Sequence, residues 1–183
     1  MAKASTNFGI LDGQCKDAVA ALFTSSFASS EGAQEGALVG RLATALAARI
    51  DNRDIVGIGA YEDQALIGAL FLTRLHFDPP TEAFMLSPVA VATAKQGRGM
   101  GQAMIRFGLD ALSRRRVAFV VTYGDPAFYG KLGFVALSES VVPPPHPLSM
   151  PHGWLGQSLS ENPIPVLQTR PACAPEFNDP AYW

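Results

Sequence analysis

The feature that most constrains this chain is a glycine-rich turn, QGRGMG at residues 96–101, which joins two segments of different periodicity. The segment before it, FMLSPVAVAT, is a valine-rich run typical of a β-strand. The segment after it has apolar residues at helical spacing, at Met104, Ile105, Leu109 and Leu112. A glycine turn between a strand and a helix directs backbone N–H groups at one point, where the helix dipole attracts an anion. The turn therefore predicts an anion-binding site, unless its glycines serve only to make a tight turn.

Two common phosphate-binding loops do not fit this turn. A Walker loop requires Gly-Lys-Ser/Thr after its glycines, whereas Gln102 follows Gly101. The dinucleotide fingerprint GxGxxG would place its third glycine at position 102, and it belongs in the first βαβ unit of a parallel sheet. Here the glycines are spaced GxGxG, and an antiparallel hairpin is expected before the turn. Neither nucleotide-binding interpretation fits the sequence.

The segments around the turn predict an α/β fold, a mixed sheet with helices on its faces. Residues 15–30 and 36–50 carry apolar side chains at helical spacing and are expected to form two helices. Two β-type runs at 54–61 and 65–75, around a short polar turn, predict a hairpin. After the helix that follows the glycine turn, residues 117–123 predict a buried strand. Residues 125–132 then predict a brief helix with Asp125 as its N-cap, and residues 133–137 a returning strand.

The composition is that of a globular protein, and it argues against several classes of binding partner. With 183 residues, 48% hydrophobic and 16% charged, the chain is long enough for one domain with a sizeable core. The formal charge of -2 argues against nucleic-acid binding, which usually needs a concentrated basic surface. Two widely separated cysteines, no secretory leader and no long apolar run indicate a cytoplasmic protein without membrane contact. The three histidines are too scattered to predict a metal site.

The C-terminal residues 143–183 differ from the rest in being rich in proline and aromatic residues. We expect a domain at 1–142 and an extension at 143–183 that packs on the same domain or on a partner, with a homodimer as one possibility. Trp154, Phe177, Tyr182 and Trp183 support this expectation, because such side chains are costly to leave in water. Within the extension, IPVLQT at residues 164–169 predicts one more short strand.

Two stretches of this sequence resemble motifs of the GNAT superfamily of N-acetyltransferases. SPVAV-x4-QGRGMGQAMI is similar to the superfamily's acyl-CoA-binding motif, Q/R-x-x-G-x-G/A, and VVTYGDPAFYGKLGF is similar to its later motif, which ends in FYxKLGF. The residues GDPAFYGKLGF of the second stretch further resemble a subgroup of predicted bacterial acetyltransferases. The resemblance covers Ile55 to Leu137 well, the preceding helices loosely, and the extension not at all. It implies a mostly antiparallel central sheet, flanked by helices and splayed where acyl-CoA binds.

The resemblance also implies which residues bind acetyl-CoA, the expected co-substrate. Loop amides of residues 96–101 would hold the pyrophosphate, and Arg98 would either add charge there or face solvent. Main-chain groups of the preceding strand would hold the pantetheine arm, with the Val91 N–H donated to the developing oxyanion. Asp125 is primarily a helix cap, with a contact to CoA as a second role. The full implied set is Val89, Ala90, Val91, Gln96, Gly97, Arg98, Gly99, Met100, Gly101, Gln102 and Asp125.

The reaction that the resemblance implies is direct attack of an amine on the thioester, through a tetrahedral intermediate. Tyr129, at the FY position, would protonate the leaving CoA thiolate, although an aromatic packing role is the simpler alternative. No general base stands out, because we expect His76, Asp78 and Glu82 to be solvated loop residues. The acceptor would be a small-molecule or peptide amine, and no metal is expected. Two other functions stay open: a non-catalytic acyl-CoA-binding module, and an acyltransferase that uses a longer acyl-CoA.

Overall fold

The computed structural model describes residues 5–183 and confirms a mixed α/β fold. Among these residues, seven strands form one sheet in the order β1-β2-β3-β4-β5-β7-β6. Parallel pairing joins β4 to β5, whereas β1–β2, β5–β7 and β6–β7 are antiparallel. The strands are β1 (Asn7–Ile10), β2 (Ile55–Glu62), β3 (Ala65–Leu75), β4 (Ala83–Val91), β5 (Phe119–Tyr123), β6 (Val135–Ala136) and β7 (Trp154–Ser158). The helices are α1 (Lys16–Glu31), α2 (Ala33–Ala47), α3 (Met100–Arg114) and α4 (Pro126–Tyr129).

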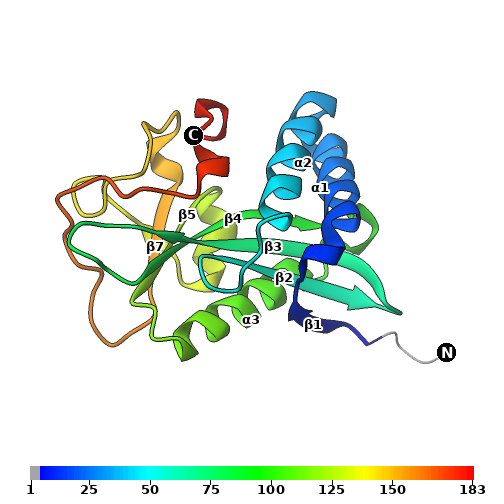
Figure 1. The fold of residues 1–183 in the computed structure, drawn as a ribbon, viewed down its shortest axis with the longest axis horizontal. Coiled ribbons are helices and arrows are strands. Elements are labelled where there is room, and N and C mark those ends of the chain that lie inside the picture. Colours follow the sequence, from blue (N-terminus) through cyan, green and yellow to red (C-terminus); the bar gives the residue numbers. More distant parts are fainter. Residues whose placement is uncertain (1–4) are drawn as a thin grey trace. The chain divides into compact units, whose positions relative to one another are not determined.

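The chain divides into two compact units, and the first consists of residues 1–72 and 88–108. In this unit α1 and α2 lie side by side on one face of β3, and α3 lies on the other (Figure 1). The Phe23 ring of α1 contacts the Phe71 ring of β3, with centroids 6.0 Å apart. A Cβ built at Gly108 of α3 would instead meet Leu72 and Leu70. Because successive side chains of a strand alternate between faces, β3 needs apolar residues throughout, as its sequence has.

Close packing of α1 on α2 explains two glycines in the second helix. A Cβ at Gly40 would lie 2.1 Å from Thr24 Oγ1, and one at Gly36 would lie 2.6 Å from the Thr24 carbonyl oxygen. Both distances are far below an ordinary contact, so only glycine allows the two helices this separation. The helix pair is therefore fixed in place beside the strands that it covers.

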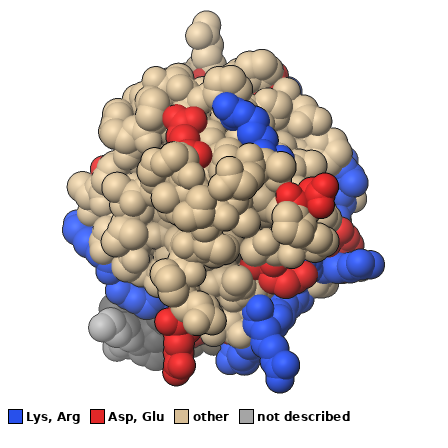
Figure 2. All heavy atoms as spheres, turned by 90° about the vertical axis from the view of Figure 1, so that its left-hand side faces the viewer, with Lys and Arg blue, Asp and Glu red and all other residues tan. Residues whose placement is uncertain are grey.

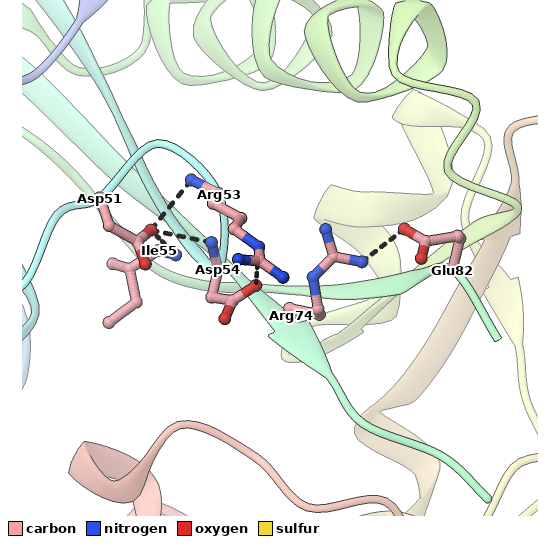
Figure 3. A network of polar contacts seen from close by, with 6 residues as sticks. All are labelled: Asp51, Arg53, Asp54, Ile55, Arg74 and Glu82. Carbon is pink, nitrogen blue, oxygen red and sulfur yellow. Dashed lines mark hydrogen bonds and ion pairs between the residues drawn. The ribbon is translucent and has the colours of Figure 1, made fainter. Parts of the chain in front are cut away.

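A side-chain cap forms the turn that leads from α2 into β2. Asp51 Oδ1 accepts hydrogen bonds from the main-chain N–H groups of Arg53, Asp54 and Ile55 at 2.9, 2.8 and 2.9 Å (Figure 3). Desolvation tends to raise the pKa of Asp51, but the three backbone donors outweigh it, so the pKa is lowered. The ionised carboxylate is therefore the form that stabilises the turn.

The second unit consists of residues 73–87 and 109–183, and β5 is its central strand. Ala83–Leu86 of β4 pair in parallel with Phe119–Thr122, and β7 pairs along the opposite edge of β5. The β4–β5 register ends at Leu86 and Thr122, two residues before Pro88, which cannot donate to a ladder. In the same unit Arg74 forms an ion pair with Glu82 (Figure 3) and lies over the Phe84 ring.

The extension packs on strands of its own unit. Trp154 is fully buried in β7 and donates its Nε1 proton to the Val142 carbonyl at 2.9 Å. Phe177 and Trp183 are buried as well, and the Trp183 ring stacks on Tyr123 of β5. Figure 2 shows the side where the extension runs in Figure 1, and its surface is mostly uncharged, with acidic and basic side chains interspersed.

One expected strand does not form. Residues 164–169 are irregular, and their Leu167 N–H makes a single backbone hydrogen bond, to the Val141 carbonyl. Pro163 and Pro165 lack the N–H groups that a ladder requires, which explains the failure. No helix among residues 5–183 is both long and apolar enough to cross a membrane.

Candidate functional site

The glycine turn places the start of α3 directly after the end of β4. A short 3₁₀ turn, Thr93–Lys95, leaves the strand, and α3 begins at Met100. Gly97 and Gly99 have φ angles of 72° and 77°, in the left-handed region that favours glycine, and the space where each Cβ would lie is open. The helix opens with the hydrogen bond from the Ala103 N–H to the Gly99 carbonyl. The preceding N–H groups, at residues 100–102, therefore point out of the helix at its positive end.

Two cations lie near this turn, and they differ in their surroundings. Lys95 forms an ion pair with Glu62, whose other oxygen accepts a hydrogen bond from Thr6. The hydrogen bond from Lys95 is the main cause of a lowered pKa at Glu62, and the charge of Arg98 contributes to it. Arg98 itself is exposed on the turn. An anion at the start of α3 would thus meet backbone donors first and the Arg98 guanidinium second.

A small cavity lies between the end of β4 and helix α1. It measures about 130 Å³, and its walls are Val89, Ala90, Val91 and Gln96 on one side and Ser26, Phe27, Ser30 and Glu31 on the other. The Val91 carbonyl accepts two hydrogen bonds, from Ser26 Oγ at 3.1 Å and from Gln96 Nε2 at 2.9 Å. The Gln96 side chain is thus directed at the strand, and its main-chain N–H donates to the Thr93 carbonyl.

The second unit holds the predicted acid, Tyr129, at the end of α4. Asp125 caps this helix, with its Oδ1 accepting the Ala127 N–H at 2.8 Å, and Pro126 follows as its first residue. The Tyr129 ring makes edge contacts with Phe128 and Phe134, at centroid distances of 5.0 and 5.6 Å. These contacts fix the ring at the carboxyl end of β5.

The side chain of Thr122, a fully buried residue of β5, interacts with the Tyr129 hydroxyl. Thr122 donates its own proton to the Leu86 carbonyl at 2.8 Å. Burial raises the pKa of Tyr129, the interaction with Thr122 offsets part of that rise, and the Asp125 charge adds to it. Tyr129 is therefore a neutral phenol at physiological pH, which is the form that can donate a proton.

A larger cavity in this unit lies between the end of β5 and the extension. Its volume is about 320 Å³, and it is lined by Tyr123, Gly124, Asp125, Pro126, Met150, His152 and Gly153. The Tyr123 hydroxyl accepts the Met150 N–H at 2.7 Å and is hydrogen-bonded to Ser149. Gly124 also lies against the catalytic candidate, because a Cβ there would be 2.6 Å from Tyr129 Cε2.

The family of the acetyltransferase (GNAT) domain matches residues 13–136 of this chain. The chain belongs to the GNAT family. Among curated proteins it is 29% identical over 113 residues to the uncharacterized N-acetyltransferase YjhQ of Escherichia coli K12, a match that covers 58% of this chain and 62% of YjhQ. It is 41% identical over 49 residues to the uncharacterized N-acetyltransferase YhbS of the same strain, covering 27% of this chain and 29% of YhbS. The chain thus matches less than two thirds of the length of these GNAT relatives.

Solved GNAT structures share the fold over almost the whole chain. A crystal structure of YhbS from Escherichia coli in complex with CoA has a TM-score of 0.83 at 20% identity, and the match covers 98% of this chain and 95% of that one. A GNAT acetyltransferase from Brucella melitensis in complex with acetyl-CoA has a TM-score of 0.72 at 19% identity. This match covers 96% of this chain and 100% of that one. At these identities the likeness shows the fold.

The predicted site residues of this GNAT chain fall into two groups. Residues 89–91 and 96–102 gather in the first unit, at the end of β4 and the start of α3. Asp125 and Tyr129 belong to the second unit, where Asp125 caps the start of α4 and Tyr129 is its last residue. Within residues 5–183, no group of three or more His, Cys, Asp or Glu side chains is arranged to hold a metal ion.

Sequence reasoning missed two buried hydroxyls in this GNAT domain, Ser26 and Thr122. Each donates to a carbonyl of β4, Ser26 to Val91 and Thr122 to Leu86. Ser26 had a signal in the sequence, because it continues the helical spacing of Val19, Leu22 and Phe23 and is polar on an otherwise apolar face. Thr122 had none, since threonine is an ordinary residue in a strand.

Proposed function

We propose that this protein is an N-acetyltransferase that moves an acetyl group from acetyl-CoA to an amine. The observation that carries the proposal is the cradle at the start of α3, where two left-handed glycines leave the backbone N–H groups open beside the end of β4. Membership of the GNAT family supports acyl-CoA as the anion that the cradle takes. An open helix start of this kind suits a pyrophosphate, because it offers several convergent donors and a favourable dipole.

The cofactor contacts follow from the same two elements. N–H groups of residues 97–102 would bind the pyrophosphate, and Arg98 would add a positive charge from solvent. Main-chain groups of Val89 and Ala90 would hold the pantetheine arm. The Val91 N–H would donate to the thioester oxygen, which becomes an oxyanion as the amine attacks; a donor placed there in advance is worth roughly 10²–10³-fold in rate.

The reaction is a direct transfer that needs two proton movements. The neutral amine attacks the thioester carbon, the carbonyl π-bond electrons move to oxygen, and a tetrahedral intermediate forms. Its collapse breaks the C–S bond and expels CoA thiolate, while the new ammonium loses a proton to water. Tyr129 would give its proton to the thiolate, and Thr122 could then turn its hydroxyl proton from Leu86 to the phenolate. A positioned acid of this kind contributes roughly 10²–10³-fold.

The cavity between β5 and the extension is our proposed binding place for the body of the acceptor. It is lined by Gly124, which also lies against the Tyr129 ring. Its walls are mainly apolar, and Asp125 adds a negative charge at the exposed rim. These features favour an amine with a hydrophobic body over a highly charged polyamine. A contact of Asp125 with the cofactor remains a prediction.

The substitution Tyr129→Phe separates this function from a binding module. For an enzyme, we expect kcat to fall about 10²-fold or more while the Kd for CoA stays within about twofold, because the phenol acts only as the bond to sulfur breaks. A protein that binds acetyl-CoA tightly but releases no CoA thiol with any amine would be the non-catalytic alternative. Comparing the rates with acetyl-CoA and with a long-chain acyl-CoA in the same assay shows which acyl group the protein transfers.

A further inference from the structure

Ser26 is a buried hydroxyl that reaches from helix α1 to the end of strand β4. The residue is only 4% exposed, and its Oγ donates to the Val91 carbonyl 65 residues away at 3.1 Å. Neighbouring serines of the same helix behave differently. Ser25 Oγ donates to the Leu22 carbonyl, and Ser30 Oγ donates to the Ser26 carbonyl, both within α1. Ser26 is therefore the serine that ties this part of α1 to the strand.

The carbonyl that Ser26 binds is held from two directions. Gln96 Nε2 donates to the same Val91 oxygen at 2.9 Å. A carbonyl oxygen has two lone pairs, so these two donors satisfy it. On the other side of the same peptide group, the Ala92 N–H donates to the Ile67 carbonyl of β3 at 2.8 Å. Three hydrogen bonds thus fix the orientation of the peptide group between Val91 and Ala92.

Because Val91 belongs to the extended strand β4, this orientation also indicates where the Val91 N–H of the preceding peptide group points. In a trans peptide the C=O and N–H groups are directed oppositely, so the Val91 carbonyl points away from β3. In an extended strand a residue's own N–H and C=O point to the same side. The Val91 N–H therefore also points away from β3, on the strand edge at which Val89–Val91 line the cavity.

We propose that Ser26 is a positioning residue that holds the Val91 N–H in line with the thioester carbonyl of acetyl-CoA. The proposal rests on the proposed function, because it assigns a partner to the oxyanion donor of that reaction. Ser26 does not touch the reacting atoms; it acts through the Val91 backbone. Gln96 is an exposed residue that makes the second hydrogen bond to the Val91 carbonyl. Removing its side chain should therefore loosen the same peptide group.

The expected consequence of Ser26→Ala is a loss in rate without a loss of cofactor. With one donor removed, the Val91 peptide gains freedom, and the oxyanion donor is no longer held in place. We expect kcat to fall about 10-fold, less than removing the donor outright, and the Kd for CoA to stay within about twofold. Ser25→Ala is the matched control, since it removes a hydroxyl one residue away whose bond stays within the helix.

The test uses the full-length protein and acetyl-CoA labelled with a heavy isotope at the carbonyl carbon. Infrared difference spectra of the bound thioester report the hydrogen bond to its oxygen, because a donor lowers the carbonyl stretching frequency. Wild-type protein and Ser25→Ala should show this lowering, and Ser26→Ala should show a smaller one. Gln96→Ala, an exposed position that should fold normally, should also reduce it. Thermal unfolding and CoA binding of each variant confirm that it is folded.

The two hypotheses fail in different ways. If wild-type protein binds no acetyl-CoA, the proposed function and the role of Ser26 both fall. If it binds acetyl-CoA with a lowered stretching frequency that Ser26→Ala and Gln96→Ala leave unchanged, the positioning role is wrong while the acetyltransferase assignment stands.

Discussion

Gly124 offers a way to move Tyr129 without changing its chemistry. A Cβ at this position would lie 2.6 Å from Tyr129 Cε2 and 3.3 Å from Cδ2. Carbon atoms in contact normally lie about 3.5–4.0 Å apart, so the tyrosine ring of a Gly124→Ala variant must shift by about 1 Å. Phe128 and Phe134 contact the ring from other directions, so the shift has to displace the hydroxyl as well.

The size of the effect follows from the role assigned to Tyr129. A misplacement of about 1 Å can cost about 10²-fold in rate when the moved group takes part in the reaction. We therefore expect Gly124→Ala to lower kcat by about 10- to 100-fold. The strain should cost about 1–3 kcal/mol of folding stability, as is typical of overpacking. CoA affinity should stay within about twofold, because the cradle at the start of α3 is unchanged.

The assay measures CoA thiol release from acetyl-CoA with the most reactive member of a primary-amine panel. Gly130→Ala is the matched control, because it lies in the next turn of the chain and has open space where its Cβ would be. A double-mutant cycle with Tyr129→Phe isolates the cause. In the Tyr129→Phe background Gly124→Ala should cost little further rate, since the proton donor is already absent. Full additivity, or equal effects of Gly124→Ala and Gly130→Ala, would refute the reasoning.

Three further predictions concern other parts of the chain. Asp51→Ala should lower the free energy of unfolding by about 1 kcal/mol at pH 7, measured by urea denaturation. Because the folded-state pKa of Asp51 is lowered, its contribution to stability is present above about pH 4 and is lost as the pH falls below that. The difference in stability between the wild type and Asp51→Ala should therefore vanish in acid. Met150→Ala should raise the KM for a hydrophobic amine several-fold and leave the KM for acetyl-CoA unchanged, whereas Val166→Ala, equally exposed but outside the cavity, should change neither. Thr122→Val should lower kcat and move the alkaline limb of the pH–rate profile; an unchanged profile would exclude a link between this hydroxyl and Tyr129.

The elements that local sequence patterns specify were predicted correctly. The two N-terminal helices, the hairpin, the valine-rich strand and the helix after QGRGMG all have strong periodicity of their own. The Asp125 cap and Pro126 likewise marked the start of α4. These signals are local, so one sequence is enough to recognise them.

The elements that long-range pairing specifies were missed. β7 follows a proline-rich segment, and one of its two partners is β5, more than thirty residues earlier in the chain. Its sequence, WLGQS, has no clear alternation, so pairing with β5 and burial of Trp154 determine its conformation. The reverse error was made at residues 164–169, where an apolar composition suggested a strand that Pro163 and Pro165 prevent.

The same distinction applies to the candidate site. The cradle was predicted from its glycines, because left-handed backbone at Gly97 and Gly99 has a direct signature in sequence. Ser26 and Thr122 act through contacts with β4 that no local pattern encodes. The contribution of the Gln96 main-chain N–H to the phosphate site stays a prediction, and no pattern in the sequence indicated that the Gln96 side chain donates to the Val91 carbonyl.

The most direct test of the central claim is whether the protein couples CoA release to acetylation of an amine. Purified protein is incubated with acetyl-CoA and a panel of primary amines that includes hydrophobic amines, polyamines and peptide N-termini. Thiol release and the mass of each amine are measured together. We predict one CoA released for each acetyl group gained by an amine, at a rate that Tyr129→Phe lowers about 10²-fold or more. Tight binding of acetyl-CoA with no amine gaining an acetyl group would contradict the account.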